Sequence, residues 1–249
     1  MNIFDSHLHI IDPQFPLYKN NGFLPEAFTV EQYQQRVSDL NIKSGAVVSG
    51  SFQQFDQSYL INALDKLGAG FVGVTQLPRD VSDEEILSLD KHGVRAVRFN
   101  VRRGGSESVS ELNYFADRVY ELVNWHVELY ADYHALIALK PELCKLSAVS
   151  IDHLGIDKSG IPLLKEFAEQ GVKIKATGFG RVNFNALDLV KELYKISPEA
   201  LMFGTDLPST RAPSPFEDQH LFDLAACLGE KGAEQVCWEN ARKFYGFTV

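Results

Sequence analysis

The sequence contains few cysteines, and none of them forms a CxxC pair. Cys144, Cys227 and Cys237 are the only three in 249 residues, so at least one thiol stays unpaired in any disulfide arrangement. Scattered cysteines of this kind are typical of free thiols in a reducing compartment rather than of a small disulfide-stabilised protein.

Long apolar runs and an N-terminal targeting segment are also lacking. No stretch approaches the roughly 18 apolar residues that a membrane span needs. The first residues, MNIFDSHLHI, have neither the basic region nor the apolar region of a secretory signal. We therefore expect a cytoplasmic protein that does not enter a membrane.

Positive charge is in short supply. Lys and Arg number 24 against 33 Asp and Glu, a formal net charge of −9. Nucleic-acid binding needs clustered positive charge, so this balance argues against it. A small anionic substrate stays compatible with the composition, because an acidic chain can still contain a locally basic pocket. The hydrophobic share of 45% excludes a disordered chain.

Short apolar runs alternate with amphipathic segments along the whole chain, and the runs are typical of buried parallel strands. We expect eight strands, at about residues 3–10, 44–51, 71–77, 93–100, 126–132, 148–155, 172–180 and 201–208. Eight strand–helix units in this length favour a single, distorted (β/α)8 barrel of the TIM type. The sequence has neither a Gly-rich dinucleotide fingerprint nor a GxxxxGK phosphate loop, so an open, doubly wound sheet is the weaker alternative. No linker divides the chain, so residues 1–249 are expected to form one domain.

Local signals mark helix ends between the strands. Three capping boxes are predicted from a Ser followed three residues later by a Glu: Ser82 with Glu85, Ser108 with Glu111 and Ser214 with Glu217. Three glycines follow periodic stretches where a left-handed helix end is expected: Gly68, Gly93 and Gly171. The irregular segment 11–29 follows the first strand, so a barrel would place it over the active face.

Catalytic side chains of such barrels lie at the carboxyl ends of the strands. The first strand ends in His7-Leu8-His9, and residues two apart on a strand point to the same side, roughly 6–7 Å apart. Two such imidazoles can bind one metal ion. His153 ends the sixth strand and Asp206 ends the eighth. A single such residue usually hydrogen-bonds a loop, but imidazoles with a carboxylate on one face suit a divalent metal or proton transfer.

Several motifs resemble the amidohydrolase superfamily of the amidohydrolase-2 type, and they span the chain in order: FDSHLHI, GVRAVRFN, SIDHLG, IKATGFGRV, LMFGTDLPSTRAP and ENARKFYGF. The branch that they resemble contains 2-pyrone-4,6-dicarboxylate lactonase and related muconolactone hydrolases. The resemblance implies a distorted (β/α)8 barrel and a catalytic set of His7, His9, His153 and Asp206. It also implies that Asp206 is the general base that activates the attacking water.

The fifth strand departs from the pattern of metal-dependent members, which usually place a His or a modified Lys there. Tyr130 stands at the ligand position, and a phenol is a poor zinc ligand at neutral pH. His126 lies at the start of the strand, where a structural role is expected, and His134 lies just beyond its end. A dinuclear site is therefore not expected. Either one divalent ion (zinc or manganese) or no ion fits the sequence, and the ligands of an ion would be His7, His9 and Asp206.

Arginines follow several of the expected strands. If Arg98 points into the barrel, then Asn100 does too, and a buried Arg needs an anionic partner from the protein or from a ligand. The resemblance implies that substrate carboxylates are bound by Arg98, Arg102 and Arg181, with Tyr130 as a further donor. Arg95 and Arg103 are expected on the surface, and Arg211 follows the eighth strand.

Two further charged residues are expected to be structural. Lys175 shares a strand face with Thr177, and a structural ion pair is the favoured interpretation. Lys175 could instead hold an anion or neutralise Asp5. Asp5, two residues before His7, is expected to be a buried hydrogen-bond acceptor.

The predicted function is therefore a hydrolase that opens a small carboxylated lactone or a similar cyclic ester. One alternative is a metal-dependent decarboxylase of the same superfamily, in which arginines also hold carboxylates. Another is a barrel that binds a carboxylated metabolite without converting it. The sequence defines no oligomeric state.

Overall fold

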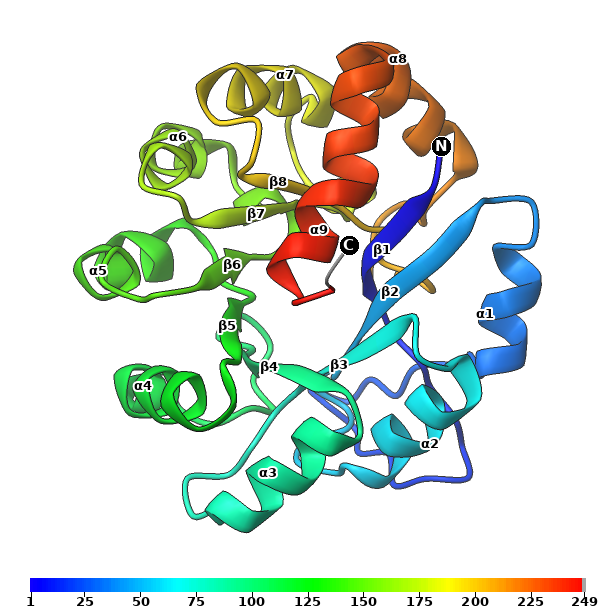
Figure 1. The fold of residues 1–249 in the computed structure, drawn as a ribbon, viewed down its shortest axis with the longest axis vertical. Coiled ribbons are helices and arrows are strands. Elements are labelled where there is room, and N and C mark those ends of the chain that lie inside the picture. The colour runs from blue at the N-terminus through cyan, green and yellow to red at the C-terminus, as the bar shows by residue number, and fades with distance from the viewer. Residues whose placement is uncertain (248–249) are drawn as a thin grey trace.

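Eight parallel strands form a barrel in chain order, each hydrogen-bonded to the next, and helices surround it (Figure 1). The computed structural model describes residues 1–247. The strands are β1 (Ile3–Leu8), β2 (Ile42–Val48), β3 (Phe71–Thr75), β4 (Val94–Phe99), β5 (His126–Leu129), β6 (Val149–Ile151), β7 (Lys173–Ala176) and β8 (Leu201–Phe203). The predicted (β/α)8 barrel is confirmed. Each strand ends before its predicted end, because the chain leaves the ladder there to form the loops of the site. The single domain over 1–249 stays a prediction, and its last two residues lie outside the described range.

Helices follow the strands and cover the outside of the barrel. They are α1 (Val30–Arg36), α2 (Ser58–Leu67), α3 (Asp83–Lys91), α4 (Leu112–Val123), α5 (Tyr133–Leu143), α6 (Ile161–Glu169), α7 (Ala186–Ile196), α8 (Asp218–Glu234) and α9 (Asn240–Phe244). Short 3-10 turns are η1 (Val109–Glu111), η2 (His153–Gly155), η3 (Lys158–Gly160) and η4 (Phe179–Arg181), and a π turn η5 (Gln235–Glu239) precedes α9. Within residues 1–247, no helix combines the length and the apolar character that crossing a membrane requires.

The predicted helix ends are confirmed in part. Ser108 is an N-cap, but its side chain accepts from the backbone of Ser110 and not from that of Glu111. The Ser82 side chain accepts a hydrogen bond from the backbone of Glu85 at the start of α3, and the glycines predicted to end helices have positive φ. The predicted box of Ser214 with Glu217 is wrong, because Glu217 is itself the N-cap of α8. The chain before it is anchored by buried Phe216, whose backbone N–H donates to Ser209 Oγ at 3.0 Å, so the helix begins only after this anchor.

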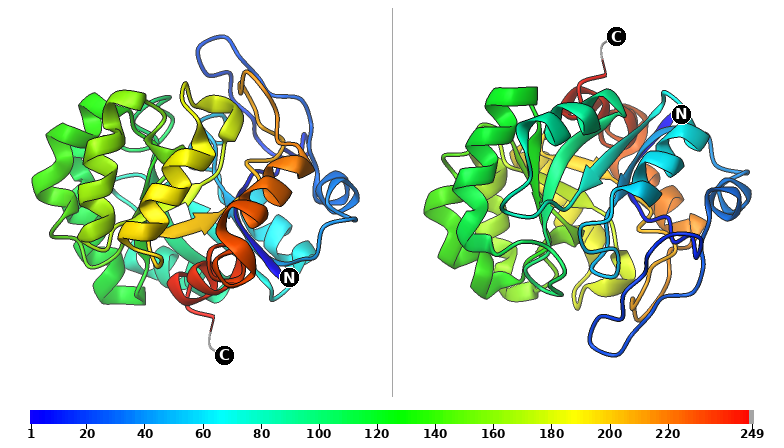
Figure 2. Two further views of the ribbon diagram at one scale, coloured as in Figure 1. Left: turned by 90° about the horizontal axis from the view of Figure 1, so that it is seen from above. Right: turned by 90° about the horizontal axis from the view of Figure 1, so that it is seen from below.

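The two ends of the barrel differ. At the amino ends of the strands, Tyr245 after α9 closes the interior, and its ring stacks on Phe4 with centroids 5.2 Å apart. At the opposite end, the loop over 11–29 and the loop over 207–217 lie side by side, far from the C-terminus in both views of Figure 2. The first of these loops is closed at its base by paired backbone hydrogen bonds between Ile11 and Phe28. The carboxyl ends of the strands are therefore covered by long loops, as predicted for segment 11–29.

Candidate active site

His7 and His9 lie at the carboxyl end of β1 and are buried. The His9 Nδ1 atom is 2.6 Å from the carbonyl oxygen of Val48. A carbonyl oxygen only accepts, so Nδ1 carries the proton and neutral His9 presents the lone pair of Nε2 to the site. The His7 Nδ1 atom faces Asp152 Oδ1 at 3.4 Å, which favours the same tautomer. Both imidazoles therefore offer bare Nε2 atoms, the arrangement that orients histidine ligands of metals.

Asp206 faces these imidazoles from the loop after β8. Its Oδ1 atom is 3.9 Å from His9 Nε2 and 3.9 Å from His153 Nε2, and it has no hydrogen-bond partner among the described residues. Its Oδ2 atom accepts a hydrogen bond from Arg181 Nε at 2.5 Å. Asp206 has a φ of 62° and His153 a φ of 51°. Such left-handed backbone is costly for residues other than glycine and is concentrated at functional sites.

The charge state of the three histidines follows from their burial. Desolvation, the largest cause in each case, lowers the pKa of His7 and lowers those of His9 and His153 well below the ordinary value. The Asp152 carboxylate acts in the opposite direction, but it offsets only part of this decrease in the pKa of His7. All three imidazoles are therefore neutral near pH 7.

The donor set can hold a metal ion. Ligand atoms of His7, His9 and Asp206 lie within 4.8 Å of one another, and so do those of His7, Asp152 and His153. The buried atoms His7 Nε2 and Asp206 Oδ1 have no partner in residues 1–247. Lone pairs that face one another need a proton donor or a cation between them, so the residues fit a single divalent ion or a bound water.

Arg98 and Asn100 both lie buried at the end of β4, as the alternation predicted. Arg98 donates from Nε and Nη2 to Asp152 Oδ2, at 3.1 and 2.8 Å, and from Nη1 to the carbonyl oxygen of Ser49 at 2.8 Å. The anionic partner that a buried Arg requires is therefore supplied by the protein. Asp152, which the sequence analysis did not single out, connects Arg98 to His7.

A cavity opens at this end of the barrel. Its lining includes His9, Arg98, Tyr130, His153 and Arg181 together with Phe23, Arg103 and Arg211. Arg103 had been expected on the surface, and it lines the cavity instead. Arg102 is not part of the lining: its side chain is exposed, 3.9 Å from Asp132. Substrate binding by Arg102 stays a prediction.

Tyr130 is placed between two of the predicted site residues. Its ring packs edge-on against His153, with centroids 5.0 Å apart, and lies 5.4 Å from the Arg98 guanidinium. This buried position at the cavity is consistent with the predicted role as a further donor, which no contact in the structure tests.

A buried ion network lies deeper in the barrel. Lys175 forms an ion pair with Glu128 and lies 3.7 Å from Asp152 Oδ1, so the structural ion pair predicted for Lys175 is confirmed. Glu128 also accepts hydrogen bonds from His126 Nε2 at 3.0 Å and from the Tyr245 hydroxyl at 2.6 Å. The structural role predicted for His126 is confirmed with it.

Asp5 belongs to a separate group of buried hydrogen bonds. Its carboxylate accepts from the backbone and hydroxyl of Thr205, at 2.8 and 2.7 Å, and from the Tyr33 hydroxyl at 3.0 Å. The suggestion that Lys175 neutralises Asp5 is wrong, because Lys175 is engaged by Glu128. Burial raises the pKa of Asp5 to about 6, although these donors oppose the shift. Asp5 is thus the buried acceptor that the sequence predicted.

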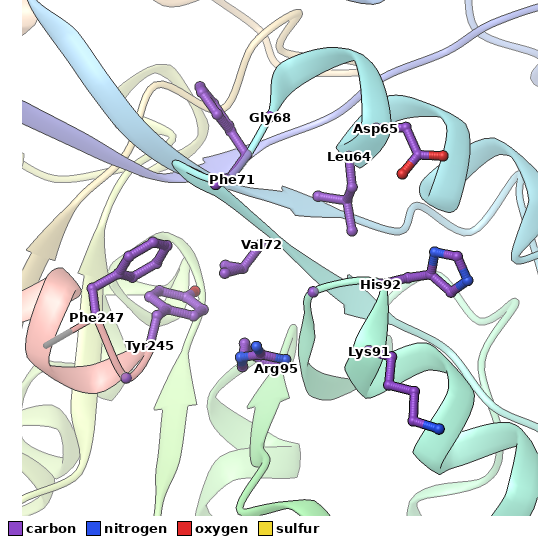
Figure 3. Close-up of a pocket in the computed structure, with 13 residues that line it drawn as sticks. Leu64, Asp65, Gly68, Phe71, Val72, Lys91, His92, Arg95, Tyr245 and Phe247 are labelled. Atoms are coloured by element: carbon purple, nitrogen blue, oxygen red, sulfur yellow. The ribbon is translucent and has the colours of Figure 1, made fainter.

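A second cavity, of about 450 Å³, opens at the other end of the barrel between α2, α3 and the C-terminal segment. Figure 3 shows Tyr245 and Phe247 on one side of it, and Lys91 and His92 on the other. The Arg95 guanidinium beside it is held by Asp90 at 2.9 Å. None of the predicted catalytic residues lines this cavity. The candidate active site is therefore the cavity at the carboxyl ends of the strands.

Several site residues were missed by sequence reasoning. Glu128 lies between His126 and Tyr130 in the sequence, and the two-residue alternation of a strand would have placed it on the same face as those residues. Asn20 and Phe23 reach the site from the loop over 11–29. No local pattern marks these two residues, because their contacts are made with loops distant in the sequence.

A (β/α)8 barrel that collects three histidines and an aspartate at the carboxyl ends of its strands has the architecture of the hydrolases that work with imidazoles and a carboxylate. A family model described as amidohydrolase matches residues 4–247, and the chain belongs to this family. The predicted superfamily is confirmed.

Two curated relatives match this chain over most of their own length. A 4-sulfomuconolactone hydrolase of Rhizobium radiobacter is 26% identical over 98% of this chain and 89% of its own length. A 2-pyrone-4,6-dicarboxylate hydrolase of Comamonas testosteroni is 25% identical over 87% of this chain and 80% of its own. The fold is shared with a crystal structure of a probable 2-pyrone-4,6-dicarboxylic acid hydrolase from Acinetobacter baumannii with citric acid bound. That match has a TM-score of 0.84 and 24% identity, and covers 99% of this chain and all of the other.

Proposed function

We propose that this protein is a hydrolase that opens a small carboxylated lactone by the attack of water. The observation that carries the proposal is a buried carboxylate oxygen, Asp206 Oδ1, that has no hydrogen-bond partner among residues 1–247. It faces His9 and His153, which line a cavity that also has an excess of guanidinium groups. The relatives named above, which are hydrolases of anionic lactones by their names, support the same conclusion.

The charges around the cavity favour an anionic substrate. Arg98 and Arg181 are neutralised by Asp152 and Asp206, respectively. The Arg103 and Arg211 side chains also line the cavity, and neither forms an ion pair with a carboxylate of residues 1–247. The cavity thus carries uncompensated positive charge although the chain as a whole is acidic. Guanidinium groups bind carboxylates through two parallel hydrogen bonds, so a small carboxylated molecule suits it.

Asp206 is proposed as the general base. Its Oδ1 atom is buried without a hydrogen-bond partner among the described residues, 3.9 Å from His9 and His153, which line the cavity. Arg181 holds Oδ2 and fixes the orientation of the carboxylate. A water hydrogen-bonded to Oδ1 would lose its proton to Asp206 as it attacks the lactone carbonyl carbon. The tetrahedral intermediate then collapses, the ring C–O bond breaks, and the same proton passes from Asp206 to the leaving oxygen.

The histidines are proposed to divide two tasks. The Nε2 lone pairs of His7 and His9 are hydrogen-bond acceptors, and one of them would accept the second proton of the attacking water and orient it. His153 makes no hydrogen bond from either ring nitrogen to a described residue, so it is free to adopt the tautomer that donates to the carbonyl oxygen. Such a donor stabilises the negative charge that develops on that oxygen.

One divalent ion would be held by His7, His9 and Asp206, the donor types that suit zinc or manganese. A bound ion supplies Lewis acidity, polarising the carbonyl and making water more acidic. Metal analysis of the purified protein distinguishes one ion per chain from none. We keep the cytoplasmic location as part of the same proposal.

The decisive experiment replaces Asp206 by Asn. We expect the rate of ring opening, followed by absorbance on a panel of carboxylated lactones, to fall by about 10²–10⁴-fold, the usual contribution of a positioned general base. The matched control is Asp157→Asn, a loop carboxylate outside the cavity lining whose contact to the Ser159 backbone an amide oxygen preserves. Full activity of Asp206→Asn on every lactone that the native enzyme hydrolyses would disprove this mechanism.

Two alternative functions give different outcomes in the same assays. A decarboxylase would release carbon dioxide from a carboxylated substrate and contain stoichiometric metal. A binding barrel would give a calorimetric signal with a carboxylated ligand and no product by mass spectrometry. No observation in the structure favours either over ring opening.

A further inference from the structure

The loop over 11–29 carries a tight hairpin at its tip. Asn20 and Phe23 exchange backbone hydrogen bonds at 2.9 and 3.1 Å. Asn21 and Gly22 between them have φ values of 51° and 77°, the positive values that a two-residue hairpin turn requires. The Phe23 side chain lines the active-site cavity. The hairpin tip is therefore a defined structure at the cavity, and its geometry depends on the Asn-Gly pair.

Asn20 connects this tip to two other loops. Its Nδ2 atom donates to the carbonyl oxygen of Arg103 at 3.0 Å. Its Oδ1 atom accepts from Arg211 Nη1 at 2.9 Å, and its backbone oxygen accepts from Arg211 Nη2. The Arg211 guanidinium also lies over the Phe23 ring, 4.3 Å from its centroid. The Arg211 guanidinium is thus held at the cavity by hydrogen bonds from its Nη atoms to Asn20 and by the Phe23 ring against its face.

The charge of Arg211 is not compensated by these contacts. All of its described hydrogen-bond partners are neutral oxygens of Asn20. Burial, and then the neighbouring Arg103 charge, lower the pKa of Arg211 from its ordinary value. No carboxylate of residues 1–247 forms an ion pair with it. Its backbone is also held in an unusual state, with a φ of 59°. A positioned guanidinium without an anionic partner at the edge of a substrate cavity is a binding group for an anion.

Little free space remains beneath this group. The cavity has a free volume of about 40 Å³, room for only a few water molecules, each of which needs about 10–15 Å³. A lactone ring is larger, so its entry displaces side chains at the cavity mouth. Arg211 is partly exposed there, and exchanging its neutral Asn20 acceptor for a carboxylate gives a hydrogen bond about twice as strong.

We propose that Arg211 determines specificity for substrates with a second anionic group, and that Asn20 is the residue that positions its guanidinium. The inference rests on the proposed function for the identity of the substrate. It concerns a different group, because Arg98 and Arg181 are already paired with carboxylates of the protein.

Calorimetry with stable ring carboxylates tests the inference without turnover. The probes are benzene-1,3-dicarboxylate and benzoate, which differ by one anionic group. We expect Arg211→Met to weaken binding of the dicarboxylate about tenfold to a hundredfold, the usual effect of removing a charge-assisted contact, and to change benzoate binding less than about threefold. Asn20→Ala should weaken the dicarboxylate by a smaller factor. The control is Arg79→Met, because Arg79 is bound to Glu111 on the surface and does not line the cavity.

Kinetics extend the test to an anionic lactone. For a lactone with two anionic groups, Arg211→Met should raise KM with kcat within about threefold, since binding and not chemistry is lost. Equal losses for benzoate and the dicarboxylate, no loss for either, or a native protein that does not prefer the dicarboxylate would overturn the inference. A native protein that binds the dicarboxylate through Arg211 but hydrolyses no lactone would refute the proposed function and leave the specificity role intact.

Discussion

Replacing Glu128 by Gln perturbs the buried ion network behind the active site. Glu128 is fully buried and accepts hydrogen bonds from His126 and Tyr245 while it pairs with Lys175. Burial alone would raise the pKa of Glu128, but the Lys175 charge and the His126 contact outweigh it and lower the pKa to about 2. The carboxylate is therefore ionised in the folded protein at neutral pH, and the variant removes a charge while keeping the shape of the side chain.

The cost follows from what is left behind. Without the Glu128 charge, the carboxylate that the described residues still offer the buried Lys175 ammonium is that of Asp152, whose Oδ1 atom lies 3.7 Å away. Breaking a buried ion pair by removing one partner typically costs about 3–5 kcal/mol. For a chain of this length, that corresponds to a decrease in Tm of roughly 6–20 °C. Asp152 would also be attracted away from His7 and Arg98, so we expect a lower kcat/KM in the variant that stays folded.

Thermal and urea unfolding measure this effect directly. The control is Glu166→Gln, because Glu166 pairs with Lys140 on the exposed surface and should shift Tm far less. The double variant Glu128→Gln/Lys175→Met removes both charges and should recover part of the lost stability. A loss below about 1 kcal/mol for Glu128→Gln, or a double variant less stable than the single one, would refute this account of the network.

Two further predictions concern the histidines of the site. Because burial lowers the pKa values of His7, His9 and His153, we expect kcat/KM to stay level as the pH is lowered to 6.5 and to fall only at a lower pH. A decline centred at pH 6.5 or higher would contradict the neutral histidines. Gly178→Ala should reduce kcat/KM at least tenfold, because a Cβ atom there would lie 2.7 Å from His153 Nδ1. The control is Gly171→Ala, which also has a positive φ but has no atom within 4 Å of the new Cβ, so it should affect stability only.

The strand pattern predicted the architecture because its signals are local. A parallel strand that is covered on both faces is mostly apolar, so runs such as 45–48 and 71–74 can be recognised without any knowledge of their neighbours. The same locality predicted that Arg98 and Asn100 share a face, and the structure buries both. The rule that catalytic residues lie at the carboxyl ends of strands then directed attention to His7 and Asp206.

Pairings between distant segments could not be predicted in this way. Asn20 and Arg211 meet although 191 positions separate them, and neither carries a local signal for the contact. The alternation grouped Arg98 with Asn100, but the partner of Arg98, Asp152, depends on the register of three neighbouring strands. Helix starts failed for a related reason: Ser214 fits a capping box locally, yet the buried anchor at Phe216 delays the helix.

The buried charges near the amino ends of the strands influence the histidines at the carboxyl ends. From the closed end, the Tyr245 hydroxyl contacts Glu128, Glu128 pairs with Lys175, and Lys175 faces the same Asp152 oxygen that faces His7. Burial raises the pKa of Asp152, but His7 and the cations beside it outweigh this and keep the pKa well below the ordinary value. An ionised Asp152 favours the His7 tautomer with a bare Nε2 atom. Because each group in this series is buried, solvent cannot compensate for a charge that is lost near the C-terminal segment. We therefore expect such a loss to change the tautomer preference of His7 in the active site.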